Sequence, residues 1–278
     1  MKLGIVGLPN VGKSTLFNIL TTLLLPDAGD IKVLGMDLIT DYKLIRQEIG
    51  YLPGTFSLYP DLSVRENLDF FAVMYKSDIE ANMDLIRPIW KQIEPFSKRK
   101  AGKLSGGMKQ KLALCCALIH RPKILFLDEP TTGVDPVSRK EFWDILQNIR
   151  TQGITVLVST PYMDEATLCD RIALIQDGNI LGVNTPSYIV EHFQGSLYTF
   201  KSANIFSLLN ALRECPLQCN YYPYGEYCHI AFYEDMSEAM PLFVQFLEDH
   251  HQEHGEILPI QPSIEDCFIE IVKMNQHE

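Results

Sequence analysis

The segment that most constrains the fold runs from Gly7 to Ser14, reads GLPNVGKS and satisfies the spacing G-x-x-x-x-G-K-[ST]. It follows the short apolar run 3–6 and precedes a stretch with helical spacing, which predicts a strand, a glycine loop and a helix in that order. In a loop of this kind the backbone N–H groups wrap a phosphate group. The sequence therefore predicts a nucleotide-binding site near the start of the chain.

Single positions of this loop have distinct chemical roles. Gly12 lets the backbone approach the phosphate closely, and Asn10 tolerates a left-handed conformation better than most residues. Lys13 supplies positive charge to the β- and γ-phosphates, and the Ser14 hydroxyl is a candidate ligand of Mg²⁺. The predicted nucleotide-binding residues are Gly7, Leu8, Pro9, Asn10, Val11, Gly12, Lys13, Ser14 and Thr15.

A second element of the candidate site is the apolar run 123–130, KILFLDEP, which ends in two carboxylates. Neighbouring side chains at the end of a strand point in different directions, so two carboxylates can divide two tasks between them. Asp128 is predicted to hold Mg²⁺, and Glu129 is predicted to be the catalytic residue that polarises an attacking water.

A third element is the segment 104–111, LSGGMKQK, at the start of a predicted helix over 105–121. Ser105, Gly106 and Gly107 offer a hydroxyl, free N–H groups and a helix dipole, which together favour an anion. One chain rarely needs two phosphate cradles for one nucleotide. Two chains that face each other head to tail would use both, with each nucleotide between one chain's loop and the other chain's LSGG.

Together these motifs resemble the nucleotide-binding subunits of ABC transporters, from about residue 19 to the C-terminus. The resemblance rests on LSGGMKQKLALCCAL as signature, on ILFLDEPTTGVDP as Walker B and D-loop with Asp135, and on IGYLPGTFSLYPDLSVRENL around the Q-loop. The closing PSIEDCFIEI resembles the C-terminal extension of ABC-2 type drug-export ATPases. The resemblance implies an ATP hydrolase with ATP and Mg²⁺ as cofactors. It also implies two partners, a second ABC ATPase chain (identical or different) and an ABC-2 type transmembrane permease that holds the chain on the cytoplasmic face of the membrane.

The chain departs from the family pattern at three places. Gly54 stands where the Q-loop usually carries Gln, and Pro161 stands where the family usually has its switch His. Both changes remove a polar side chain from the site, so the chain's own site is expected to be weakened. Asp164 and Glu165 are interpreted as helix-start carboxylates rather than substitutes. The first strands of the family's domain are expected to be missing, which would leave a strand at 31–35 with an unpaired edge.

Two alternatives to an exporter subunit stay open. The opening GIVGLPNVGKSTLFN resembles Obg-like GTPases or ATPases, which act as switches, but the sequence has neither a DxxG motif nor an Asn-Lys pair for a base reader. The other alternative is a truncated or fused ABC ATPase that does not transport, with an Obg-like leader joined near residues 17–20.

Strands alternating with helices predict an α/β fold of the P-loop type with a mainly parallel sheet covered by helices. Local signals include a capping box from Ser63 to Glu66 and a hairpin turn at Asp177-Gly178. We expect a nucleotide-binding domain over 1–195, with a helical signature subdomain at about 60–120. The composition changes near residue 195, and 196–278 is expected to be a small α+β extension.

Composition excludes some classes of partner. The net charge of −11 argues against nucleic acid, whose binding relies on Lys and Arg. No apolar run approaches the ~20 residues of a membrane span. Seven cysteines fit reduced thiols better than disulfides or a zinc site.

Contact with a permease is expected near the Q-loop segment and the helices within 63–93, although helical spacing favours core positions for Phe70 and Phe71. The aromatic residues considered for that contact are Phe56, Tyr59, Phe70, Phe71 and Tyr75.

Overall fold

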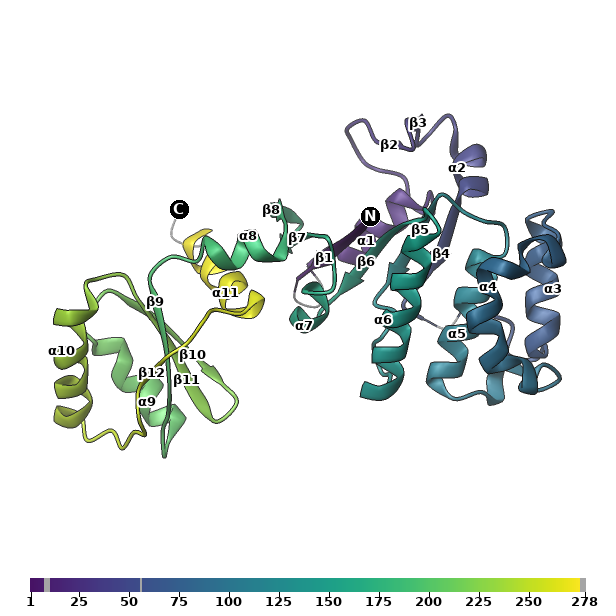
Figure 1. The fold of residues 1–278 in the computed structure, drawn as a ribbon. Coiled ribbons are helices and arrows are strands. Elements are labelled where there is room, and N and C mark those ends of the chain that lie inside the picture. Colours follow the sequence, from purple (N-terminus) through teal and green to yellow (C-terminus); the bar gives the residue numbers. More distant parts are fainter. Residues whose placement is uncertain (8–10, 56, 276–278) are drawn as a thin grey trace. The chain divides into compact units, whose positions relative to one another are not determined.

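The computed structural model describes residues 1–7, 11–55 and 57–275 and separates into two compact units, Met1–Pro186 and Ser187–Glu278 (Figure 1). Each unit has its own sheet and its own hydrophobic core. Within the described ranges, no helix is long and apolar enough to cross a membrane.

The first unit is built on a six-stranded sheet with the strand order β4-β5-β6-β1-β7-β8. Its strands are β1 (Lys2–Val6), β4 (Ile49–Leu52), β5 (Ile124–Asp128), β6 (Thr155–Thr160), β7 (Arg171–Gln176) and β8 (Asn179–Asn184). Neighbouring strands are parallel except β7 and β8, which form the predicted hairpin. The predicted mainly parallel α/β sheet is thereby confirmed.

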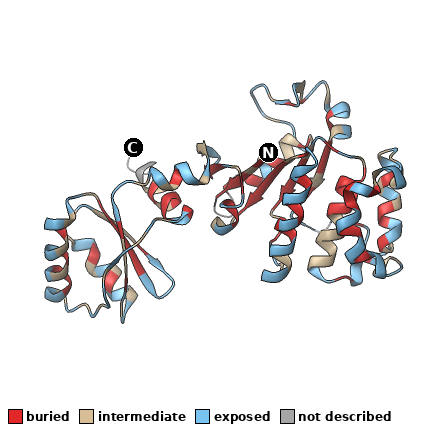
Figure 2. Ribbon diagram, in the orientation of Figure 1, coloured by how far each residue is buried: buried red, intermediate tan, exposed pale blue. Residues whose placement is uncertain are grey.

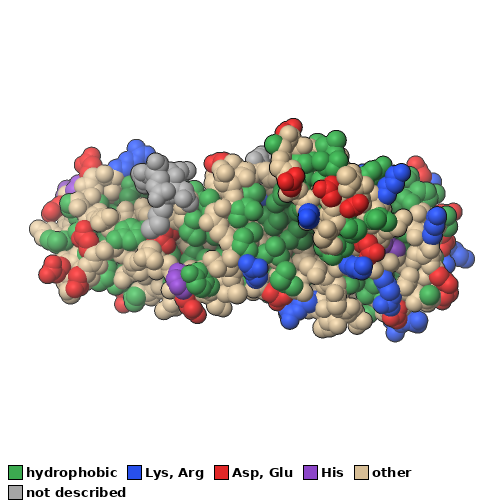
Figure 3. Space-filling model, turned by 90° about the horizontal axis from the view of Figure 1, so that it is seen from above, with side chains coloured by type: hydrophobic (Ala, Val, Ile, Leu, Met, Phe, Trp, Pro, Cys, Tyr) green, Lys and Arg blue, Asp and Glu red, His purple; other side chains and the backbone are tan. Residues whose placement is uncertain are grey.

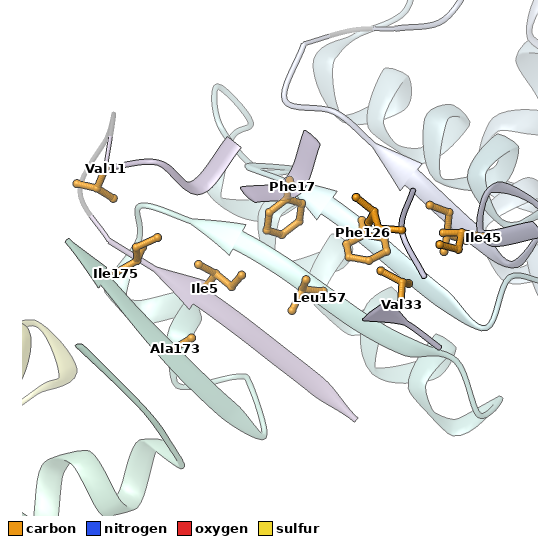
Figure 4. Close-up of a cluster of buried hydrophobic side chains, with 11 residues drawn as sticks. Ile5, Val11, Phe17, Val33, Ile45, Phe126, Leu157, Ala173 and Ile175 are labelled. Atoms are coloured by element: carbon orange, nitrogen blue, oxygen red, sulfur yellow. The ribbon is translucent and has the colours of Figure 1, made fainter. Parts of the chain in front are cut away.

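Most strands of this sheet are buried, β8 being the exception, and helices cover the sheet (Figure 2). They include α1 (Lys13–Leu20), α2 (Tyr42–Glu48), α6 (Pro136–Thr151) and the short α7 (Met163–Ala166). On one face, Phe17 of α1 meets Phe126 of β5 edge to face at 5.9 Å, and Ile45 of α2 is fully buried in the same cluster (Figure 4). This packing fixes the start of α1 over the carboxyl ends of the strands.

Three helices pack on one another beside the sheet: α3 (Val64–Met74), α4 (Ile79–Ile93) and α5 (Gly106–Leu118). The predicted capping box is confirmed, because Ser63 and Glu66 bond each other's backbone N–H groups. The predicted core position of Phe70 is wrong: its side chain is 40% exposed, while Phe71 is half-buried. Phe70 instead stacks edge to face with exposed Tyr59, at 4.7 Å between ring centroids.

The predicted strand at 31–35 does not join the main sheet. The strand β2 (Lys32–Val33) pairs with β3 (Met36–Asp37) in a separate two-stranded ribbon. Several large hydrophobic side chains around this ribbon are exposed, namely Leu23, Leu24, Leu25, Leu34, Ile39 and Leu44. Figure 3 looks down on this side of the molecule and shows hydrophobic side chains at the surface among charged ones.

The second unit has the element order β-α-β-β-α-β, followed by a further helix. Its four-stranded sheet has the order β10-β11-β9-β12, and every pair is antiparallel. The elements are β9 (Ser196–Lys201), α9 (Ile205–Ala211), β10 (Cys219–Tyr224), β11 (Tyr227–Phe232), α10 (Met236–Asp249), β12 (Leu258–Pro259) and α11 (Ile264–Asn275), and α8 (Pro186–Glu191) precedes them.

The two faces of this sheet have different coverings. Phe200 and Phe232 pack against Phe243 of α10 in a hydrophobic cluster. From the sheet, Tyr222 and His229 instead reach Asp266 of α11 through hydrogen bonds of 2.6 and 2.8 Å. A buried polar cluster therefore fastens the last helix to the sheet.

Candidate nucleotide-binding site

The glycine loop connects β1 to α1 as the sequence predicts, although Leu8, Pro9 and Asn10 lie outside the described residues. A Cβ atom on Gly7 would lie 2.3 Å from the carbonyl oxygen of Ile175, so only glycine fits there. Gly12 has φ +96° and precedes the first turn of α1, a conformation that favours glycine. Val11 is buried in the core cluster of the sheet and anchors the loop from below.

A cavity of about 670 Å³ lies at the start of α1. It brings four predicted loop residues, Gly12, Lys13, Ser14 and Thr15, to the two predicted carboxylates, Asp128 and Glu129. Among the described residues, the lining consists of Gly12, Lys13, Ser14, Thr15, Asn18, Tyr51, Pro53, Gly54, Thr55, Asp128, Glu129 and Thr132. A lysine, two hydroxyls and two carboxylates in one cavity match the chemistry of a metal-bound phosphate chain.

Lys13 is the buried cation of the cavity. Its side chain is 2% exposed, its Nζ donates to the Gly7 carbonyl oxygen at 2.6 Å, and Nζ lies 3.5 Å from Oε1 of Glu129. Burial lowers the pKa of Lys13, while the Glu129 carboxylate opposes that shift. A second source of negative charge beside Nζ would therefore favour the ammonium form.

Ser159, near the end of β6, holds the carboxylate of Asp128 and the backbone of Glu129. Its hydroxyl donates to Oδ1 of buried Asp128 at 2.5 Å and accepts from the backbone N–H of Glu129 at 3.0 Å. Glu129 has φ +46°, which is a strained conformation for a residue with a side chain. The backbone turns at this residue, and the side chains of Asp128 and Glu129 both line the cavity.

The predicted departures occupy different places. Gly54 lines the cavity, and a Cβ atom there would lie 3.1 Å from the carbonyl oxygen of Asp128. A side chain at position 54 thus requires a small shift of the backbone. Elsewhere in the lining, the hydroxyl of Tyr51 donates to Oδ1 of Asn18 at 3.3 Å. Pro161 follows β6 and is half-buried, but it does not belong to the described lining of the cavity.

The structure does not bring the LSGG segment into this cavity: Ser105, Gly106 and Gly107 are absent from its described lining. Ser105 caps α5 and accepts from the N–H of Met108, as predicted for a helix start. The α-carbon of Gly107 lies against α6, where an added Cβ would come within 2.9 Å of the Ser138 hydroxyl. The predicted D-loop residue, Asp135, is exposed and caps α6 by accepting from the N–H of Ser138.

Sequence reasoning overlooked Ser159, and it placed Glu165 correctly in the first turn of α7 without predicting its burial. The sequence did contain a signal for Ser159, which is a polar residue near the end of the buried strand β6. In a parallel sheet the ends of neighbouring strands lie side by side, and Ser159 is paired in register with Asp128 of β5. Glu165 was interpreted as a helix-start carboxylate, but it is buried, with 2% of its surface exposed.

The chain is similar in sequence to ATP-binding proteins of ABC transporters. Residues 1–132 match the family profile described as ABC transporter. The chain is 40% identical over 201 residues to a probable multidrug ABC transporter ATP-binding protein, YbhF of Escherichia coli K12, covering 72% of this chain and 35% of that protein. It is 37% identical over 191 residues to the Nod factor export ATP-binding protein I of Burkholderia lata, covering 68% of this chain and 63% of that protein. The chain thus spans about a third to two thirds of the length of these relatives.

Solved structures agree with the sequence comparison. An ATP-binding subunit of an ABC transporter matches with a TM-score of 0.63 and 26% identity, over 69% of this chain and 81% of that chain. The ATP-binding cassette MJ0796, a dimer in a post-hydrolysis state with ADP and Pi, matches with a TM-score of 0.58 and 27% identity, over 66% of this chain and 84% of that chain.

Proposed function

We propose that the chain is the ATP-binding subunit of an ABC-2 type exporter, because its sequence and fold are similar to those of ATP-binding proteins of ABC transporters. In this function the chain hydrolyses ATP with Mg²⁺. It binds a permease in the membrane, and that permease holds it on the cytoplasmic face. The names of its relatives, a multidrug transporter protein and a Nod factor exporter protein, support an export role. The PSIEDCFIEI segment, which lies within and just before α11, supports the ABC-2 subtype.

The residues of the cavity suit the chemistry of ATP and Mg²⁺. Lys13 and the N–H groups at the start of α1 would hold phosphate oxygens, and the Ser14 hydroxyl and Asp128 offer the oxygen ligands that Mg²⁺ prefers. Bound Mg²⁺ would neutralise charge on the phosphates. Glu129, fixed by the bond from its N–H to Ser159, would accept a proton from the attacking water.

One observation carries the proposal that two chains share each nucleotide: the cavity holds the loop and both carboxylates but none of the residues 105–107. The signature segment, whose Ser105 and Gly106 are exposed, would then complete the cavity of a second ABC ATPase chain. The dimeric state of the matching MJ0796 cassette supports this arrangement.

We further propose that this chain's own site is catalytically weak and that the partner chain is a different one. Gly54 has no side chain to contact Mg²⁺ or water, and Pro161 offers neither a donor nor a titratable group. The chain's own LSGG segment is complete and would serve the partner's site. Weak hydrolysis alone and strong hydrolysis in the mixed dimer are therefore expected.

The test is steady-state ATP hydrolysis by the purified chain with Mg²⁺, beside the variant that carries Gly54→Gln and Pro161→His. We expect the double variant to be at least about tenfold faster, because each change returns a polar group to the site. Glu129→Gln in that variant should abolish the gain. Fast turnover by the unchanged chain without a partner would refute the weak-site proposal, and failure to bind Mg-ATP would refute the ATPase proposal altogether.

A further inference from the structure

Glu165 is a buried carboxylate whose hydrogen-bonding capacity is used by three segments. Its Oε1 accepts from the Thr131 hydroxyl at 2.7 Å and from Nε and Nη2 of Arg139 at 3.1 and 3.0 Å. Its Oε2 accepts from the Thr160 hydroxyl at 2.6 Å. A buried carboxylate without such partners would be strongly destabilising, so this set of contacts is a stable unit.

Two of these contacts hold the chain next to functional positions. Thr131 lies two residues after Glu129, in the turn that leaves β5. Thr160 immediately precedes Pro161, and its hydroxyl also accepts from the N–H of Tyr162 at 3.1 Å. Because the Thr160 hydroxyl donates to Glu165 while accepting from Tyr162, it fixes the backbone on both sides of Pro161.

The third contact reaches α6. The guanidinium of Arg139 lies over the Tyr162 ring, 4.1 Å from its centroid, and contacts exposed Asp164 at 3.4 Å. Arg139 is one turn after Asp135, which caps the same helix. The cluster therefore joins the β5 turn, the β6 loop and the start of α6 within one network of bonds.

We propose that Glu165 is a positioning residue that holds the Glu129 turn and the Pro161 loop in fixed relation to each other and to α6. Glu165 does not line the cavity, so it acts through Thr131, Thr160 and Arg139 and not on the nucleotide. We call the contacts of Glu165 with Thr131, Thr160 and Arg139 the clamp. The relevance of the clamp to hydrolysis rests on the proposed ATPase function, but the clamp is present in the chain without nucleotide.

Hydrogen exchange measured by mass spectrometry on the full chain without nucleotide tests the clamp directly. Glu165→Gln keeps the shape of the side chain but removes the negative charge opposite Arg139. Its NH₂ group also faces the hydroxyl of Thr131 or of Thr160, which donates to the carboxylate in the unchanged chain. We expect exchange about tenfold faster in peptides over 128–134 and 158–168. Asp164→Asn is the matched control, since it removes a 77% exposed carboxylate from the same arginine, and it should leave both peptides unchanged.

Two single-contact variants keep the proposal testable if Glu165→Gln does not fold. Thr160→Val should loosen mainly 158–168, and Thr131→Val mainly 128–134, because each removes one hydroxyl at nearly constant volume. In folded double variants with Glu165→Gln the effects should be less than additive. Exchange in Glu165→Gln or in both valine variants that equals the unchanged chain would overturn the clamp.

A nucleotide experiment separates this proposal from the proposed function. The chain has two tryptophans, and Trp143 lies on α6 one turn after Arg139, so in a Trp90→Phe background its emission reports on this region. With Mg-ATP we expect an unchanged Kd in Glu165→Gln but at least a halved emission change and at least tenfold lower kcat. If the unchanged chain does not bind Mg-ATP, the ATPase function is refuted. The hydrogen-exchange result then still decides whether the clamp exists. Equal emission change and equal kcat in Glu165→Gln would overturn its positioning role.

Discussion

Replacing Asp266 by asparagine tests the polar cluster that fastens α11 to the sheet of the second unit. Asp266 is 1% exposed, and it accepts hydrogen bonds from the hydroxyl of Tyr222, from Nδ1 of His229, and from the N–H and hydroxyl of Ser263. These contacts use both carboxylate oxygens as acceptors. Asparagine keeps the shape but replaces one acceptor with an NH₂ group that faces donors, so at least one contact is lost.

The size of the effect follows from the pKa of Asp266. Burial alone would raise this pKa, but the hydrogen bonds from His229, Ser263 and Tyr222 outweigh it and lower the pKa from 3.8 to about 2. This difference corresponds to about 2 kcal/mol of stability in the ionised form. Because the folded pKa lies below the unfolded one, the contribution is present above about pH 4 and is lost as the pH falls through about 2.

The assay must report on the second unit alone. Trp90 and Trp143 both lie in the first unit, so tryptophan emission should not change between the variants. Hydrogen exchange of the β10, β11 and α11 peptides in the full chain gives the opening free energy of the second unit. We expect Asp266→Asn to lower it by about 2 kcal/mol at pH 7 and by progressively less as the pH approaches 2.

The control for that experiment is Asp249→Asn, which removes the same charge from an exposed position at the end of α10. It should change the opening free energy by less than about 0.5 kcal/mol. An equal loss in both variants, or a difference that does not depend on pH, would show that the buried contacts of Asp266 do not stabilise the second unit as reasoned.

Three further predictions concern single side chains. Gly7→Ala places a Cβ 2.3 Å from a β7 carbonyl oxygen, so thermal or urea unfolding should show the first unit less stable by about 1–3 kcal/mol. Ser159→Ala removes the hydrogen bond to Asp128, and the Mg²⁺ concentration that half-saturates ATP binding should rise about tenfold in a titration. Cys215 has its pKa lowered to about 7, chiefly by a hydrogen bond from Cys219, so its alkylation by iodoacetamide should be half-maximal near pH 7 and shift to higher pH in Cys219→Ala, which has no donor.

Features encoded by neighbouring residues could be predicted from the sequence. The capping box of Ser63 and Glu66 and the hairpin turn at Asp177-Gly178 each depend on a few consecutive residues. The cavity also followed from the sequence, because strand-loop-helix and strand-carboxylate patterns end at the same edge of a parallel sheet. Lys13 and Asp128 lie in one cavity for this reason.

Features that depend on distant residues could not be predicted. Glu165 takes its partners from 26 and 34 residues away, and nothing in its own segment distinguishes a buried carboxylate from an exposed one at a helix start. Phe70 has the spacing of a core residue, but it is 40% exposed and its ring meets that of Tyr59, which is itself exposed. In both cases tertiary contacts decided the outcome over local pattern.

The position of β1 has a consequence for how the protein is made. This strand is synthesised well before its two neighbours in the sheet, β6 and β7, which pair with it at 156–160 and 171–174. At translation rates of about 5–20 residues per second, roughly 150 residues and some ten to thirty seconds separate β1 from them. During that interval the phosphate loop has no sheet to support it, so ATP in the cell gives the nascent chain little help in folding. The phosphate loop is therefore made long before the strands that complete its part of the sheet.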